Sequence, residues 1–146
     1  QLGTITKVDS EGTSYMMESQ KGASTGNNSG IYPDEVLEHN ICTGGNSEKY
    51  REFKMEGLSA GTYKIRLFCS TIQANSGAER SKWKVSVDSV ETDFLLPTDF
   101  NPKNNLTQWL EQTVEVGEDG FSILWGVASS GSYIYVPLNI IDIEKI

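Results

Sequence analysis

The sequence predicts an all-β protein, in which short antiparallel strands form a sandwich or a barrel. Apolar and polar residues alternate with a period of two through several short segments, which places each set on one face of a strand. Turn-forming residues separate these segments at short intervals, and no long segment has the 3.6-residue period of a helix. With 146 residues, the chain is most simply one domain, residues 1–146, long enough for a two-layer core without disulfides or metals.

The clearest pattern is a hairpin within residues 53–70, FKMEGLSAGTYKIRLFCS. Its turn is GLSAG, in which Gly57 and Gly61 can take positive φ. In the second strand of the hairpin, apolar residues alternate with mostly polar ones. The apolar set is Tyr63, Ile65, Leu67 and Cys69. One face of this hairpin should therefore be core.

Before the hairpin, the signals are weaker. Residues 1–20 predict one or two short strands, and residues 21–30 are loop by composition. Pro33, followed by two acidic residues, predicts a helical turn over about 33–39, because acidic groups favour a helix N-terminus. His39 follows this turn, and we interpret it as a cap at the C-terminus of the helix, where a cation is favourable. Residues 42–49, CTGGNSEK, are again predicted to be loop.

The remaining elements are strands. Pro137 indicates an edge or a bulge in the last of them. By alternation, Trp83 and Trp125 should belong to the core. The predicted strands lie near residues 50–56, 63–70, 82–88, 90–96, 110–116, 121–127 and 133–143.

The connections differ in length. If consecutive strands run antiparallel, the loops 71–81, 97–109 and 128–132 share one end of the sandwich, and the short turns share the other. A fixed scaffold with long loops at one end is a common way to build a site.

Composition limits the function. The net charge of −8 disfavours nucleic acid and anionic membranes as partners, and no apolar run approaches the roughly 20 residues of a membrane helix. There is one histidine, and no nucleophile set, phosphate-binding loop or multi-histidine metal site can be assembled. We therefore expect no catalytic activity. The two cysteines, Cys42 and Cys69, favour free thiols, although a disulfide stays open for an exported protein.

The loop end suits a neutral sugar. A sugar ring needs an aromatic plane for its C–H face and neutral donors and acceptors for its hydroxyls. We expect Trp109 and Tyr133 to stack on sugar. Trp109 is equally compatible with packing onto the core, and Tyr133 with Tyr135 could instead form a half-buried cross-strand ladder. The residues expected to hydrogen-bond sugar hydroxyls are Arg80, Asn75, Asn104 and Asn105.

Several segments together resemble a known family. GIYPDEVLEHNI, the 53–70 hairpin, WKVSVD and the closing YVPLNIIDIEKI resemble malectin-like, galactose-binding-domain-like jelly-roll carbohydrate-binding modules, over about residues 30–143. Such modules are often part of secreted polysaccharide-degrading enzymes of Bacteroidetes-type bacteria. The chain departs from the family pattern by Trp83, where a smaller aromatic is usual, and by its long 97–109 loop.

The resemblance implies that the fold is an antiparallel β-sandwich of the jelly-roll type. It also implies an extracytoplasmic location, secreted or at the cell surface, an appended catalytic domain, and a sugar site at the loop end. Modules of this family frequently hold a structural Ca²⁺, so the resemblance makes such an ion an expectation. In this sequence, Asp34, Glu79 and Asp99 are acidic residues that could hold such an ion with help from carbonyl groups, although no EF-hand spacing is present.

Three functions compete. The favoured one is a non-catalytic carbohydrate-binding module that targets an enzyme to polysaccharide or oligosaccharide. The second is a structural or protein-interaction domain, a spacer or adhesin piece without a sugar site. The third, a small hydrolase, would need two carboxylates facing each other across a groove. An exposed aromatic cleft at the loop end would favour the first, and uniformly buried aromatics would favour the second.

Overall fold

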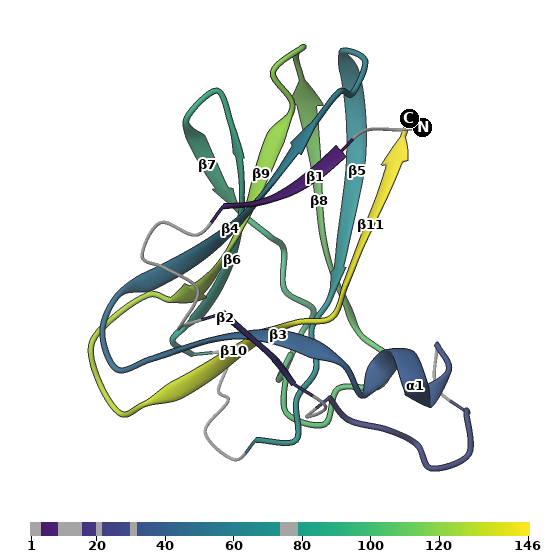
Figure 1. The fold of residues 1–146 in the computed structure, drawn as a ribbon, viewed down its shortest axis with the longest axis vertical. Coiled ribbons are helices and arrows are strands. Elements are labelled where there is room, and N and C mark those ends of the chain that lie inside the picture. Colours follow the sequence, from purple (N-terminus) through teal and green to yellow (C-terminus); the bar gives the residue numbers. More distant parts are fainter. Residues whose placement is uncertain (1–3, 9–15, 20–21, 30–31, 74–78) are drawn as a thin grey trace.

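The computed structural model describes residues 4–8, 16–19, 22–29, 32–73 and 79–146. The chain is an antiparallel β-sandwich, which confirms the predicted fold class (Figure 1). One layer is a five-stranded sheet with the strand order β1-β4-β9-β6-β7. Its strands are β1 (Thr4–Val8), β4 (Lys49–Glu56), β9 (Phe121–Val127), β6 (Ser81–Val87) and β7 (Val90–Asp93).

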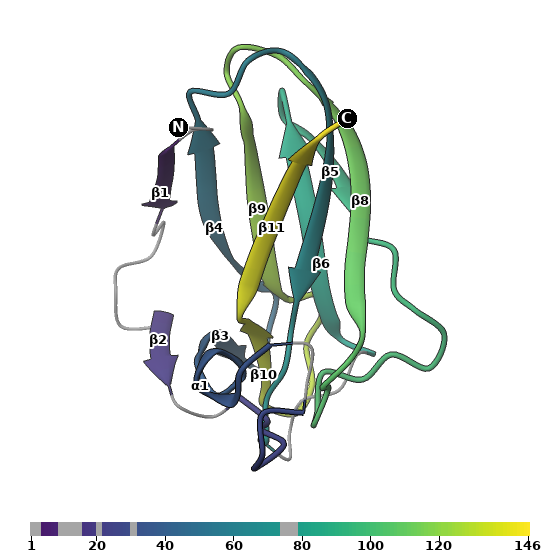
Figure 2. The ribbon, with the colours of Figure 1, turned by 90° about the vertical axis from the view of Figure 1, so that its right-hand side faces the viewer.

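The other strands form two three-stranded sheets. In one, β5 (Gly61–Phe68) lies between β11 (Ile140–Lys145) and β8 (Trp109–Val116). In the other, β3 (Asn40–Gly45) lies between β10 (Ile134–Leu138) and β2 (Met16–Ser19). Figure 2 shows β11, β5 and β8 side by side, with β10 and β3 below them near the short helix α1 (Asp34–Leu37). Within the described ranges, no helix is long and apolar enough to cross a membrane.

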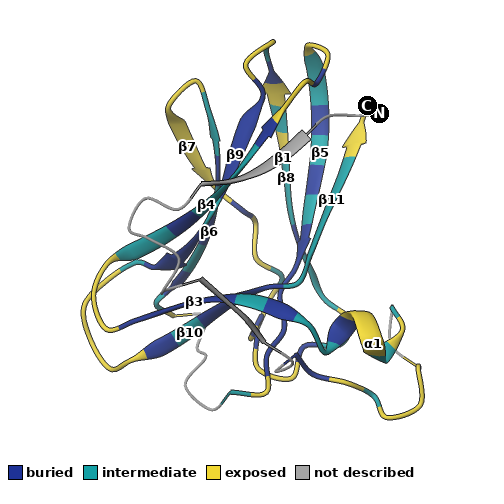
Figure 3. Cartoon of the chain, in the orientation of Figure 1, coloured by how far each residue is buried: buried dark blue, intermediate teal, exposed yellow. Residues whose placement is uncertain are grey.

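The core lies between the layers. The predicted inner face of β5 is buried, including Ile65 and Leu67, and so is the apolar face of β9 (Figure 3). Trp83 and Trp125 face each other across β6 and β9 and are almost completely buried, as predicted. Trp83 Nε1 donates a hydrogen bond of 2.9 Å to the carbonyl of Pro137. A buried indole N–H needs a partner, and here it joins the five-stranded sheet to β10.

Two expectations fail locally. The predicted loop 42–49 contains most of β3, whose residues pair with β10 on one side and β2 on the other. Ladder pairing therefore overrides the loop composition of this stretch. The predicted strand 133–143 is two strands in different sheets, divided at Asn139. Asn139 Nδ2 donates to the carbonyls of Leu37 and His39, which fixes the point where the chain changes sheets.

Other local predictions are confirmed. Pro137 lies in an edge strand, because β10 pairs only with β3 among the strands described. Gly57 and Gly61 both have positive φ at the predicted hairpin turn. His39 Nδ1 lies 2.7 Å from the carbonyl oxygen of Glu35 at the end of α1. The two cysteines, Cys42 and Cys69, are buried free thiols.

The connections have the predicted asymmetry. The short turns after β4, β6 and β8 lie at the top of Figure 1, and the long connections after β5, β7 and β9 lie toward the bottom. We call these two regions the turn end and the loop end.

Candidate functional site

The three long connections meet at the loop end through backbone hydrogen bonds. Thr71 N donates to Pro102 O, and Asn104 N donates to Thr71 O, each at 2.9 Å. These bonds join the connection after β5 to the one after β7. Arg80, at the end of the first connection, reaches the third. The connection after β5 therefore contacts each of the other two, at two different places.

Arg80 holds the loop after β9 in place. Its Nε and Nη2 donate to Ser129 O at 3.2 and 2.6 Å, and its Nη1 donates to Ser132 O at 2.5 Å. The guanidinium lies directly on Gly131, where a Cβ would be 2.6 Å from Arg80 Cζ. A planar donor group that bonds two carbonyls fixes the course of the loop that leads into Tyr133.

Tyr133 lies at the edge of this loop and is 47% exposed. Its ring covers Gly44 in β3, where a Cβ would be only 2.5 Å from the tyrosine hydroxyl. The ring centroid of Tyr135 is 5.2 Å away, at an interplanar angle of 64°. Tyr133 is thus seated on backbone beneath it and beside a second ring, which limits how far it can turn.

The predicted asparagines have different surroundings. Asn105 is 6% exposed. Its Nδ2 donates to Cys69 O and Gln108 O, and its Oδ1 accepts from the amides of Thr107 and Gln108. Asn105 therefore shapes the loop before β8. Asn104 is exposed and has a left-handed φ of 57°. Asn75 lies outside the described residues, so the prediction for it stays a prediction.

Trp109 is half-buried on the outer face of the β11-β5-β8 sheet. It lies opposite Phe68 in the register of β5 and β8, with ring centroids 5.5 Å apart. Tyr32 meets it edge-to-face, also at 5.5 Å, and Arg66 Cζ lies 5.0 Å from the ring centroid. Trp109 is thus surrounded by two rings and a guanidinium, a packed cluster stabilised by aromatic and cation–π contacts.

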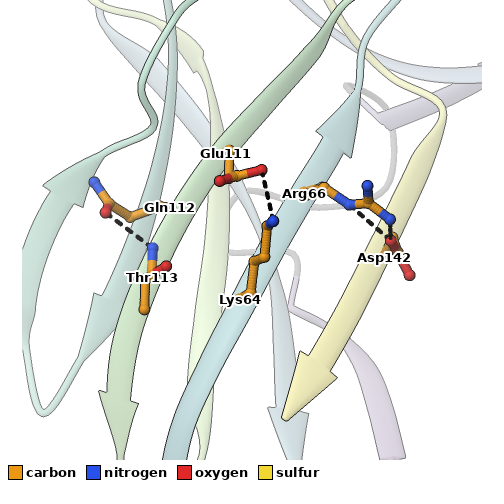
Figure 4. Close-up of polar contacts among 6 residues, drawn as sticks. All are labelled: Lys64, Arg66, Glu111, Gln112, Thr113 and Asp142. Carbon is orange, nitrogen blue, oxygen red and sulfur yellow. Dashed lines mark hydrogen bonds and ion pairs between the residues drawn. The ribbon is translucent and has the colours of Figure 1, made fainter. Parts of the chain in front are cut away.

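Polar pairs continue along the same face (Figure 4). Arg66 donates from Nε to Asp142 Oδ2 at 2.9 Å, and from Nη2 to the same oxygen. Lys64 Nζ lies 3.4 Å from Glu111 Oε2. The hydrogen bond to Asp142 raises the pKa of Arg66, and burial raises the pKa of Tyr32. The guanidinium beside Trp109 is therefore anchored on β11.

The structure brings Arg80 and Tyr133 together but does not bring Trp109 to them. The loop between β9 and β10 and the start of β8 lie at opposite sides of Figure 1. Tyr32 and Arg66 are not among the site residues that the sequence predicts. The available signal was Phe68, an aromatic residue on the otherwise polar face of its strand.

The acidic residues considered for Ca²⁺ do not form a cluster. Across the described parts of the chain, no three histidine, cysteine, aspartate or glutamate side chains come close enough to hold a metal ion. The Asp34 carboxylate accepts hydrogen bonds from Thr25 and from the amide of Asn28, and these bonds lower its pKa. Asp34 thus organises the loop before α1.

The fold has known counterparts. A family 35 carbohydrate-binding module from an environmental isolate is similar, with a TM-score of 0.51 and 16% identity over 97% of this chain and 92% of that one. Weaker likenesses are TmCBM61 in complex with β-1,4-galactotriose (TM-score 0.43, 12% identity, 99% and 88% covered) and chitosan-binding module 1 from a chitosanase/glucanase of Paenibacillus sp. IK-5 (0.40, 13%, 98% and 95%). No protein-family model and no curated protein matches the sequence. The similarity to the family 35 module supports the β-sandwich fold.

Proposed function

We propose that this chain is a non-catalytic carbohydrate-binding module that binds polysaccharide or oligosaccharide at its loop end. The observation that carries the proposal is Tyr133, an exposed ring seated on Gly44 at the end of the loop that Arg80 holds in place. An aromatic plane held in one orientation suits the C–H face of a sugar, because little rotamer freedom is lost on binding.

The surroundings of Tyr133 favour a neutral sugar. The loop before it exposes the hydroxyl-bearing residues Ser129, Ser130 and Ser132, and Arg80 supplies a guanidinium with three of its donor bonds already directed at loop carbonyls. Hydroxyl and guanidinium groups bind sugar hydroxyls without requiring an ionised ligand. We include Asn104 and Asn75 as further candidates, and we assign Asn105 the role of positioning the loop. We assign Trp109 a packing role on its sheet face. Stacking of Trp109 on a sugar stays a prediction.

We further propose that residues 1–146 form one binding domain, which targets an appended catalytic domain to its substrate outside the cytoplasm. The only histidine of the chain, His39, is bonded to the carbonyl of Glu35, which supports a structural role for it. The domain would instead be a hydrolase if it hydrolysed a polysaccharide, if this activity remained after rigorous purification, and if changing one carboxylate abolished the activity.

The test is affinity electrophoresis of the folded chain through gels that contain neutral polysaccharides, followed by calorimetry with oligosaccharides of the retarding polymer. Tyr133→Ala should weaken binding by roughly 5- to 150-fold, by analogy with the 1–3 kcal/mol of ring stacking on bases. The matched control is Tyr50→Ala on β4, whose ring lies 4.5 Å from Lys84 Nζ. Retardation by none of the polymers would favour the alternative of a spacer or interaction domain, and equal losses in both variants would place the sugar site away from Tyr133.

A further inference from the structure

The turn end carries a second concavity, far along the strands from Tyr133. It lies on the outer face of the five-stranded sheet and has a volume of about 580 Å³. Its floor is one row of the sheet, in which Lys54 of β4, Ser122 of β9 and Ser86 of β6 lie side by side in register. This volume is within the roughly 300–1,000 Å³ of small-molecule sites.

The central floor residue is buried but has no polar partner. Ser122 is only 8% exposed, yet its hydroxyl makes no hydrogen bond to any described residue. Its neighbours Phe121 and Ile123 are core residues, so by alternation Ser122 is directed away from the core and into the cavity. An unpaired hydroxyl on the floor of the cavity is a group to which a bound ligand could hydrogen-bond.

The rim of the cavity is acidic. Glu56 forms an ion pair with Lys54 at 2.7 Å. The hydrogen bond to Glu56 contributes most to the raised pKa of Lys54, and Asp119 and Glu52 also lie near enough to contribute to it. Four further carboxylates line the rim, namely Glu52 on β4, Asp88 in the turn after β6, and Glu118 and Asp119 in the turn after β8. Figure 3 shows these turns as exposed around the buried part of β9. Such a rim attracts a cation.

The arrangement fits an organic cation better than a metal ion. The described carboxylates do not converge, since no three of them are close enough to hold a metal. A cavity of this volume is also much larger than the roughly 30 Å³ that one water molecule occupies in the liquid. The ligand should therefore carry positive charge for the rim and hydroxyl groups for Ser122 and Ser86 on the floor.

We propose that this cavity binds a hydroxylated primary ammonium ion, namely an amino-sugar unit whose amine is not acetylated. The ammonium is placed against the carboxylates from the turns after β6 and β8, and the ring hydroxyls are placed against the two serines. This acidic cavity and the loop-end site recognise different chemistry, and the inference does not rest on sugar binding at Tyr133.

The test is calorimetric titration at low salt with a glucosamine trisaccharide, under conditions in which its amines are protonated, and with its fully N-acetylated counterpart. The charged trisaccharide should bind and should weaken as NaCl is raised, because salt screens the attraction. The N-acetylated trisaccharide should not bind at this site. Equal affinity for both trisaccharides would overturn the proposal.

Substitutions in the cavity test whether the charged trisaccharide binds there. The double variant Glu118→Gln with Asp119→Asn should weaken it about tenfold or more, and Ser122→Ala about fivefold, the usual effect of one lost neutral hydrogen bond. Glu144→Gln, at an exposed position near the end of β11, removes the same kind of charge elsewhere and should have no effect. Unchanged affinity in the double variant, with its melting temperature retained, would place the ligand elsewhere and overturn the assignment.

Two further probes separate the ligand classes. Spermidine carries amines but no hydroxyls, and binding as tight as that of the trisaccharide would show that the cavity selects charge alone. Ca²⁺ or Mg²⁺ bound with one-to-one stoichiometry and lost in the double variant would show a metal site instead. Neutral-polysaccharide binding at the loop end should be unaffected by the double variant, so failure of one site is distinguishable from failure of the other.

Discussion

Trp109 and Tyr133 lie in two regions that hold an aromatic ring in different ways. Trp109 is one of a row of side chains that cross the outer face of the β11-β5-β8 sheet, with Phe68 opposite and Tyr32 at its edge. Tyr133 rests on the backbone of Gly44 and keeps 47% of its surface exposed. The first setting uses the ring to stabilise the sheet, and the second leaves a ring surface for a ligand. The neighbours of an aromatic residue decide its role more than its place at a loop border does.

The largest expected effect is on stability and comes from Trp109→Ala. The change removes a half-buried ring from contacts with two other rings and Arg66, so we expect the free energy of unfolding to fall by about 3 kcal/mol, at the low end for large aromatic truncations. Affinity for a loop-end sugar should stay the same. Chemical denaturation and calorimetry on one variant measure both quantities. Lost affinity with an unchanged unfolding midpoint would make Trp109 the stacking platform.

The second effect concerns the loop that leads to Trp109. Asn105→Ala leaves the carbonyl of Cys69 and several loop groups without their amide partner, and should cost about 2 kcal/mol of unfolding free energy. Asn104→Gly is the control, because it removes an exposed amide at a position where glycine tolerates the positive φ. Urea denaturation of both variants tests the contrast, and similar losses in the two would contradict a positioning role specific to Asn105.

The third effect should be seen in binding alone. A Cβ at Gly44 would lie 2.5 Å from the Tyr133 hydroxyl, so Gly44→Ala must displace the ring. Because the displaced group is the end of an exposed side chain, we expect less than about 1 kcal/mol of lost stability. Sugar affinity should fall about as much as in Tyr133→Ala. Gly117→Ala is a suitable comparison, since a Cβ there meets nothing within 4 Å. Full affinity in Gly44→Ala would separate the seat of Tyr133 from sugar binding.

Much of this architecture follows from the sequence. Alternation was sufficient to bury Trp83 and Trp125, because a strand has only two faces and one was apolar. Connection lengths were sufficient to predict that the three long connections share one end, since antiparallel order fixes which loops are neighbours. The strand in residues 40–45 could not be predicted, because its Thr-Gly-Gly composition favours a loop and only pairing with β10 and β2 makes it a strand.

The site residues depended on information that is not local. The separation of Trp109 from Tyr133 comes from the register of β5 and β8, which sets Phe68 opposite Trp109, and from Tyr32, which arrives from a distant part of the chain. The acidic cavity likewise joins turns after β6 and β8 to the floor row through Ser122. A single sequence gives neither cross-strand register nor the side on which two turns meet.

The smallest expected effect tests how firmly the Trp109 cluster depends on charge. Arg66 lies over the Trp109 ring and is anchored by Asp142, but the two charged side chains are 38% and 36% exposed. Water screens such a pair, so Asp142→Asn should reduce the free energy of unfolding by about 0.5 kcal/mol at low salt and by less in 1 M NaCl. Glu111→Gln is the matched change on β8, across β5 from Asp142; it removes the longer contact to Lys64 and a weaker electrostatic interaction with Arg66. Denaturation curves at the two salt concentrations measure the difference. A salt-independent loss as large as that of Trp109→Ala would mean that the Asp142 anchor, rather than ring packing, holds this face together.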